Sequence, residues 1–184
     1  MSTAVVNHVP GMICNSGKKL YAFGKDSTGL IAYQFNQQGF RSNQDFDFVP
    51  SYAFFGCSLV FGVGVDHSSL FSSFFPNSQN YGLAGNYTNH DIMFVLENFL
   101  KSNFYNNHTR ISVVWHQRDA DCLSEFYKKL QNFEIIHFFC GQPLNQPRCY
   151  PTPWQLDTDV SGTHPGIKTH KTISKILCAL FNQL

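Results

Sequence analysis

Short apolar runs alternate along this chain with stretches of helical periodicity. The run IleSerValValTrp at 111–115 is continuous and rich in β-branched residues, which is typical of a strand covered on both faces. Runs at 52–55, 81–83 and 134–140 are further candidate strands. Apolar residues spaced by three and four predict amphipathic helices, and these lie at Ile92–Leu100, Leu123–Leu130 and Ile173–Phe181.

This alternation predicts the fold class. Strands joined by helices form right-handed crossovers, which produce a mainly parallel sheet between two helix layers. We therefore predict an α/β fold, a three-layer α/β/α sandwich. A chain of 184 residues that is 43% hydrophobic can bury one sizeable core. We expect a single domain over 1–184, with an irregular N-terminal lead-in of turns and short strands at 1–50 and an α/β core at 51–184.

Two helix details follow from the same patterns. The run Ser68–Phe75 is compatible with a helix that turns Phe71, Phe74 and Phe75 towards the core. Pro165 is suited to the first turn of the last helix, because proline tolerates that position.

Charge and cysteine usage limit the function classes. The 13 Lys plus Arg and 12 Asp plus Glu give a net charge of +1, so we expect neither a nucleic-acid partner nor a membrane partner. No apolar stretch approaches a membrane span and the first residues show no signal-peptide pattern, so we expect a cytoplasmic protein. The six cysteines form no CxxC pair or zinc-like spacing, which predicts free thiols.

Residues just beyond the predicted strands are the candidates for chemistry, because parallel α/β sheets bind ligands at the carboxyl ends of their strands. Ser58 stands two residues after Gly56, at the end of the first core strand. A serine nucleophile needs a base to take its proton. Among eight histidines we favour His164, in the loop before the last helix, over His116, which directly follows the strand at 111–115.

Three short motifs occur in an order that resembles the SGNH (GDSL-like) serine hydrolases. They are GlyXxxSer at 56–58, AsnXxxGlyXxxXxxGly at 80–85 and HisPro at 164–165. AsnGlnGlnGlyPheArg at 36–41 resembles the lead-in of some members, so the similarity spans most of the chain. It implies a flavodoxin-like sheet of the SGNH hydrolase fold. Compact GlyCysSer variants of the family occur in bacteria and their phages, which suggests such a source.

The resemblance implies an esterase-like site that uses no metal or organic cofactor. Ser58 would attack an ester carbonyl, and His164 would act first as general base and then as general acid. Backbone N–H groups of Ser58 and Gly85 would hold the oxyanion, and donors of this kind are worth about 3 kcal/mol each in other acyl-transfer enzymes. The substrate would be a small ester, either a carbohydrate O-acyl group or a short-chain acyl ester. The oligomeric state stays open.

Two departures from the family pattern affect the nucleophile and the oxyanion site. GlyAspSer becomes GlyCysSer, so Cys57 replaces a carboxylate next to the nucleophile. The block after the strand at 111–115 normally offers an Asn side chain, whereas TrpHisGlnArgAsp occupies 115–119 here. Arg118 or Gln117 could supply the missing donor, and an arginine would bring a permanent charge.

A third departure affects the base. The usual AspXxxXxxHis becomes SerGlyThrHis, which leaves Ser161 where the carboxylate that orients His164 would stand. In other serine hydrolases, disabling that carboxylate lowers turnover roughly 10⁴-fold. Asp159 or Asp157 could take its place, or a main-chain carbonyl could orient the imidazole of a Ser–His dyad.

Simpler interpretations of the same residues stay open. Ser58 could be a turn serine and His164 a helix cap, in which case the chain would be a binding or structural protein that keeps the fold without the chemistry. Cys57 could also act as a redox-active or acyl-accepting thiol, which predicts rapid alkylation at neutral pH. We expect His116 and His137 to be interior histidines with satisfied hydrogen bonds.

Overall fold

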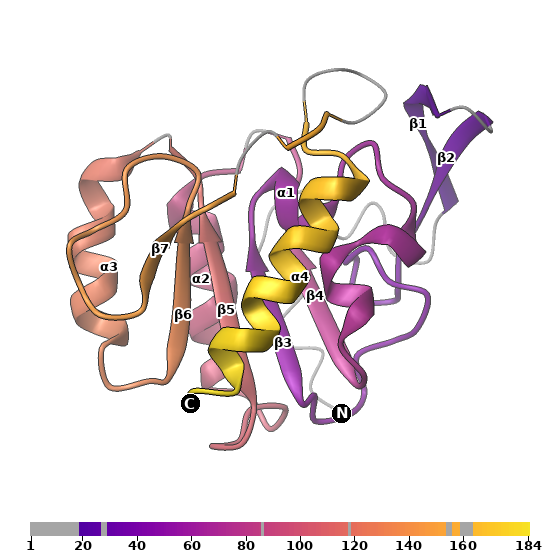
Figure 1. The fold of residues 1–184 in the computed structure, drawn as a ribbon. Helices are drawn as coiled ribbons and strands as arrows, with labels where there is room; N and C mark the ends of the chain where they lie inside the picture. The colour runs from indigo at the N-terminus through magenta and orange to yellow at the C-terminus, as the bar shows by residue number, and fades with distance from the viewer. Residues whose placement is uncertain (1–18, 27–28, 86, 118, 154–155, 159–163) are drawn as a thin grey trace.

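The computed structural model describes residues 19–26, 29–85, 87–117, 119–153, 156–158 and 164–184 (Figure 1). Its centre is a sheet of five parallel strands in the order β4-β3-β5-β6-β7. Its members are β3 (Tyr52–Gly56), β4 (Ser78–Gly82), β5 (Arg110–Trp115), β6 (Ile135–Phe139) and β7 (Cys149–Pro151). Counted from β3, this order is 2-1-3-4-5, which is one of the common doubly wound orders. The predicted parallel α/β sheet is confirmed.

Before the core, β1 (Lys19–Asp26) and β2 (Gly29–Gln34) form an antiparallel hairpin, which makes a second, two-stranded sheet. This hairpin lies within the segment 1–50 and agrees with the short strands predicted there. The short strands pair with each other and not with the five-stranded sheet.

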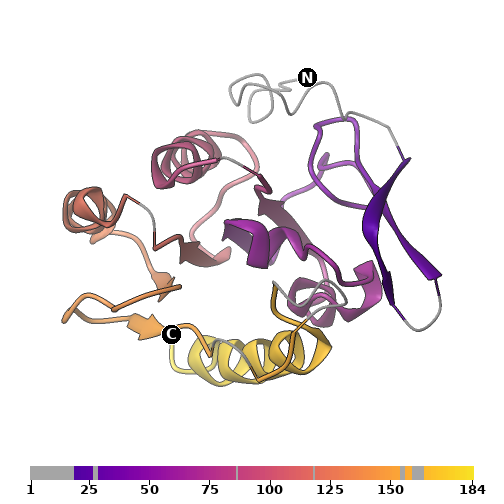
Figure 2. The same cartoon turned by 90° about the horizontal axis from the view of Figure 1, so that it is seen from above.

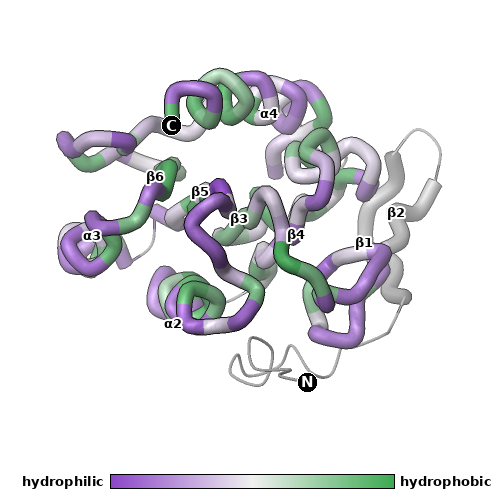
Figure 3. Tube along the Cα trace, turned by 90° about the horizontal axis from the view of Figure 1, so that it is seen from below, coloured by the Kyte–Doolittle hydropathy of each residue, from purple (hydrophilic) through white to green (hydrophobic). Residues whose placement is uncertain are grey.

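Helices cover both faces of the five-stranded sheet (Figure 2). On one face lie α2 (Asn89–Leu100) and α3 (Leu123–Leu130), and η4 (Ala120–Cys122) leads into α3. On the other face lies α4 (Ile167–Phe181), which packs against the 3-10 helices η2 (His67–Ser69) and η3 (Phe71–Phe74). Hydrophobic residues gather on the strands between these layers (Figure 3). Among the described residues, no helix has the length and apolar character needed to cross a bilayer.

Aromatic side chains of β3 pack on both faces of the sheet, because neighbouring residues of a strand point to opposite sides. On the α4 side, the Phe54 ring lies 5.3 Å from the Phe71 ring. On the α2 side, Phe55 stacks on Tyr81 with 4.6 Å between centroids and lies 5.3 Å from Phe99. All five side chains are buried, which explains why the strand reads as a continuous apolar run.

The segment between β3 and β4 differs from the prediction of one helix over Ser68–Phe75. It forms η2 and η3, separated at Leu70, whose backbone is extended with φ −64° and ψ 144°. The Ser73 hydroxyl donates to the carbonyl of His67, and such local bonds compete with helical ones. Phe74, predicted to face the core, is 48% exposed, whereas the other two phenylalanines of that stripe are buried.

The bounds of several helices and strands also differ from those predicted from the sequence. A short helix that the sequence pattern does not reveal, α1 (Ser58–Phe61), directly follows β3. β4 lies at 78–82, three residues earlier than the predicted start at Tyr81. α4 begins at Ile167 with Gly166 as its N-cap, so Pro165 precedes the helix and does not occupy its first turn. β7 is not apparent in the sequence, because only three residues of the Pro-rich connection pair with β6.

The helix α1 packs directly on β4 at Gly82. A Cβ atom on Gly82 would lie 2.1 Å from the backbone nitrogen of Phe61 and 2.6 Å from its Cα. The Asn80 side chain joins the same two elements, because its Nδ2 donates to the carbonyl of Val60 (2.8 Å) and its Oδ1 accepts from the Gly82 N–H (2.8 Å). These contacts hold α1, and therefore its first residue Ser58, against the sheet.

We expect Gly82→Ala to lower the free energy of unfolding by about 3 kcal/mol, because the added methyl group meets backbone atoms that cannot turn aside. Urea unfolding followed by circular dichroism measures this change. Gly141→Ala is the matched control, since its Cβ would meet side-chain atoms of the exposed Gln117, the nearest at 3.1 Å. Equal losses in the two variants would contradict the role given to Gly82.

Candidate active site

Ser58 is the first residue of α1 and lies directly beyond the carboxyl end of β3. Cys57 is the N-cap, and Ser58 itself is half-buried. Its carbonyl accepts the N–H of Gly62 at 2.9 Å, which fixes the backbone at this position. The connections of the sheet diverge between β3 and β5, and doubly wound sheets bind ligands at such a point. Ser58 therefore lies at the position where this fold class carries its ligands.

Arg41, the last residue of the lead-in motif at 36–41, stabilises the other end of α1. It is 1% exposed, and its guanidinium donates to the carbonyls of Phe61, Gly62 and Val65. The guanidinium also lies over the Tyr33 ring, 4.4 Å from its centroid. Burial lowers the pKa of Arg41 to about 10. The cation thus stays charged at neutral pH and neutralises the carbonyl end of the short helix.

The AsnXxxGlyXxxXxxGly segment brings Gly85 to the same edge of the sheet. The N–H of Leu83 donates to the carbonyl of Gly56 at 2.7 Å, which ties the end of β4 to the end of β3. Gly85 follows two residues later, is exposed and has φ 102°, a backbone conformation that favours glycine. Its exposed backbone is compatible with the predicted role as an N–H donor.

A buried asparagine shapes the loop after β5. The Asn89 side chain accepts the N–H of His116 at 2.8 Å and donates to the carbonyl of the same residue at 2.9 Å. His116 is half-buried, and Gln117 is exposed beside Gly141 at the end of β6. Gln117 therefore lies just beyond the carboxyl end of β5, and its role as an oxyanion donor stays a prediction. No sequence pattern reveals the role of Asn89, because Asn89 is the first residue of α2 and lies far along the chain from the loop after β5.

His137 lies inside the fold, as expected. It is 2% exposed, and its Nδ1 accepts the indole N–H of Trp115 at 3.1 Å. Burial lowers the pKa of this imidazole to about 4. His137 is therefore neutral at physiological pH and belongs to the core.

His164 lies just before α4, which begins at the carboxyl edge of the sheet and runs back along one face (Figure 1). The imidazole is half-buried. The next residue, Pro165, forms a β-bridge with Thr158, and the Gly166 N–H donates to the carbonyl of Asp157 at 3.1 Å. These contacts join the two ends of the loop that carries His164, just before α4 begins.

Asp157, one of the two candidates to orient His164, interacts with the start of α4. Its Oδ2 accepts the Lys168 N–H at 2.7 Å, and its Oδ1 accepts the N–H and the hydroxyl of Thr169, each at 2.8 Å. Burial raises the pKa of this carboxyl, but the hydrogen bonds and the nearby Lys168 charge outweigh burial, so the pKa lies below its usual value. The structure therefore gives Asp157 a role in stabilising the helix terminus.

Two residues of the predicted site, Arg118 and Asp159, lie outside the described residues, and so does Ser161, which stands where the orienting carboxylate is expected. Within the described part of the chain, no group of three or more His, Cys, Asp or Glu side chains could hold a metal ion. Comparisons of the chain with protein-family models, curated proteins and solved structures find no match. In the described part of the chain, Ser58, Gly85 and Gln117 follow the carboxyl ends of β3, β4 and β5, and His164 lies in the loop before α4.

We expect Asp157→Ala to lower the free energy of unfolding by about 1 kcal/mol at pH 7, the usual effect of losing a helix-terminus acceptor. The carboxyl has a lower pKa in the folded state than its ordinary value of about 3.9. Its stabilisation is therefore complete above that value and is lost as the pH falls through the folded pKa.

Chemical denaturation of the wild type and of Asp157→Ala at several pH values tests this expectation. The difference between them should disappear in acid. Thr158→Ala, a change at the exposed neighbouring residue, is the control and should stay within about 0.5 kcal/mol of the wild type. A difference for Asp157→Ala that persists unchanged at pH 2 would show that the carboxylate is not what stabilises α4.

Proposed function

We propose that this chain is a serine hydrolase of the SGNH type that cleaves a small ester through an acyl-Ser58 intermediate. The observation that carries the proposal is that Ser58 opens α1 just beyond β3, at the switch point of a doubly wound sheet where ligands bind. The exposed Gly85 follows β4, and the half-buried His164 lies in the loop before α4. The motif residues Asn80, Gly82 and Arg41 support it, because their contacts hold α1 in place.

In the proposed mechanism, Ser58 Oγ attacks the carbonyl carbon of the ester while His164 takes the hydroxyl proton. The backbone N–H groups of Ser58 and Gly85 stabilise the oxyanion, and the Gln117 amide is a further donor at this edge. His164 then protonates the leaving alcohol. Water attacks the acyl-Ser58 ester by the same path in reverse, and the acid is released.

The group that orients His164 distinguishes this site from a complete triad. Asp157 already accepts three hydrogen bonds from α4, so we assign it no catalytic part. Asp159 or a main-chain carbonyl orients the imidazole in this proposal. A dyad without a carboxylate retains part of the activity, since serine hydrolases that lack the carboxylate keep measurable turnover.

A second candidate function is a binding or structural protein without hydrolytic chemistry. The observation in its favour is that Cys57 and Ser161 replace the two carboxylates of the family pattern, and that Asp157, a possible substitute for the second, is bound to α4. This alternative predicts that no ester is cleaved and that Ser58 can be changed without effect.

Turnover of p-nitrophenyl acetate by the full chain separates the two candidates. We expect Ser58→Ala to lower kcat by about 10³-fold or more, because the acyl-enzyme can no longer form. Ser73→Ala changes an exposed serine of η3 and should leave turnover unchanged. Equal turnover in the wild type and in Ser58→Ala would refute the proposed function.

His164 and His116 can be compared directly as candidates for the general base. Both are half-buried, and the loop of His116 is held through its backbone by Asn89. We therefore expect His164→Ala to lower kcat by about 10³-fold and His116→Ala to have little effect. The reverse pattern would transfer the role of base to His116.

A further inference from the structure

Cys57 and Cys140 face each other at the carboxyl edge of the sheet. Their Sγ atoms are 3.8 Å apart, although the residues are 83 positions apart in sequence. A disulfide bond is about 2.05 Å long, so the sulfurs must approach by less than 2 Å to form one. Cys57 follows β3 directly and Cys140 follows β6 directly, and the Cys140 N–H donates to the carbonyl of Trp115 at 3.0 Å.

The surroundings of the two sulfurs are unequal. The hydrogen bond from Cys140 lowers the pKa of Cys57, burial opposes this, and the Leu59 amide and the Ser58 hydroxyl lower it further. The pKa of Cys140 is raised, first by its hydrogen bond to Cys57 and then by burial. Of the two sulfurs, Cys57 is therefore the better suited to act as the thiolate, with Cys140 as its hydrogen-bond donor. A thiolate beside a thiol is the arrangement from which disulfides form.

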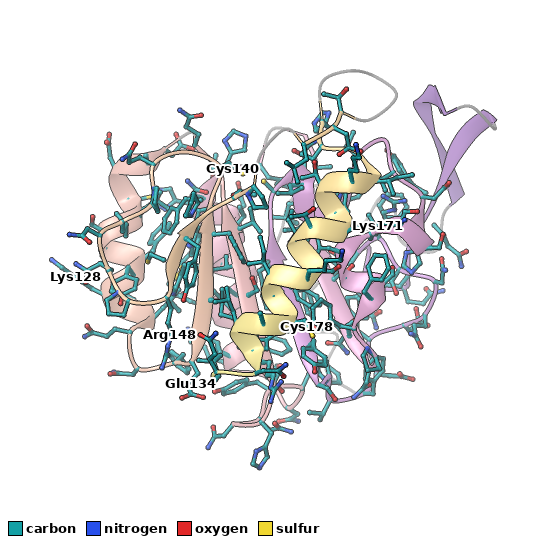
Figure 4. All side chains as sticks on the ribbon, viewed as in Figure 1. Lys128, Glu134, Cys140, Arg148, Lys171 and Cys178 are labelled. Atoms are coloured by element: carbon teal, nitrogen blue, oxygen red, sulfur yellow. The ribbon has the colours of Figure 1, made fainter. Side chains whose placement is uncertain are left out.

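The other described cysteines are less suited to this chemistry. Burial raises the pKa of Cys122, and it raises the pKa of Cys149 to about 11. Cys178 is exposed on α4, towards the end of the helix away from the carboxyl edge where Cys140 lies (Figure 4). Access alone would favour oxidation of Cys178, whereas thiolate character and proximity favour the pair at the edge.

We propose that Cys57 and Cys140 are a redox modification site, which a small hydroperoxide oxidises to a reversible disulfide. Cys57 is 4% exposed, so the oxidant must be small, and Cys140, which is half-buried, shares the same edge. A bulky disulfide such as oxidised glutathione would reach Cys57 poorly, which makes hydrogen peroxide the suitable class of reagent.

The chemistry balances in two steps. The Cys57 thiolate attacks one oxygen of hydrogen peroxide, the O–O bond breaks, and Cys57 becomes a sulfenic acid. The released hydroxide takes the proton of the Cys140 thiol and leaves as water. The Cys140 thiolate then attacks the Cys57 sulfur, the S–S bond forms, the S–O bond breaks, and the second hydroxide leaves as water with a solvent proton. The two thiols lose two electrons, and a dithiol restores them by exchange.

The disulfide also affects the neighbouring nucleophile, and this consequence rests on the proposed function. Cys57 is the N-cap of α1, and Ser58 is the next residue. Drawing Cys57 Sγ towards Cys140 shifts the backbone that carries the Ser58 N–H and hydroxyl. We expect oxidation to lower esterase turnover and reduction to restore it.

Peptide mapping of the unmutated 184-residue chain tests the disulfide without any variant. Trypsin releases Cys57 in 42–101, Cys140 in 130–148 and Cys149 in 149–168, each with no second cysteine. After a brief treatment with hydrogen peroxide and quenching by an alkylating agent, we expect a cross-linked pair of 42–101 with 130–148, lighter than the two peptides by two hydrogen atoms. Alkylation of Cys57 and Cys140 should fall about tenfold and return after dithiothreitol.

Matched variants and a second readout make the outcome decisive. Cys140→Ser should abolish the cross-link, and Cys178→Ser should leave it unchanged. Separate alkylated peptides for Cys57 and Cys140 after oxidation, with Cys178 oxidised instead, would overturn the proposal. A cross-link without any ester turnover in the reduced protein would support the redox site and contradict the proposed hydrolase. Ester turnover without a cross-link would support the hydrolase and contradict the redox site.

Discussion

The contact between α1 and Gly82 holds the candidate nucleophile segment against the sheet. A peptide group of the short helix occupies the space that a side chain at 82 would need, with 2.1 Å between the Phe61 nitrogen and a Cβ at that position. A helix of four residues has little stability of its own. It persists here because Asn80 and Arg41 bind its carbonyl groups from two other parts of the chain. Ser58 depends on this arrangement.

The charge of Arg41 illustrates how the motif at 36–41 contributes. Moving a guanidinium out of water is costly unless hydrogen bonds satisfy it. Three backbone carbonyls and the face of Tyr33 provide that environment, and the pKa still falls to about 10. A motif recognised only as a lead-in thus acts as a support for the nucleophile segment, 17 residues before Ser58.

The strands could be predicted from the sequence because both of their faces are covered. Phe54 and Phe55 pack on opposite layers, so the run is apolar throughout. Other features depend on partners that are distant along the chain, and no local pattern reveals them. α1 is held by residues from β4 and the lead-in, and the proximity of Cys57 to Cys140 arises only when β3 and β6 join one sheet. Asp157 is a plausible orienting group by chemistry alone, but its position beside Thr169 commits it to α4.

Covalent trapping with a fluorophosphonate tests the assignment of Ser58 as nucleophile most directly. Such a reagent phosphonylates a serine that a neighbouring base activates, and it spares ordinary surface serines. We predict one adduct per chain in the peptide 42–101, which fragmentation places on Ser58, and no adduct in Ser58→Ala. An unmodified wild-type protein, or an adduct that persists in Ser58→Ala, would contradict the assignment.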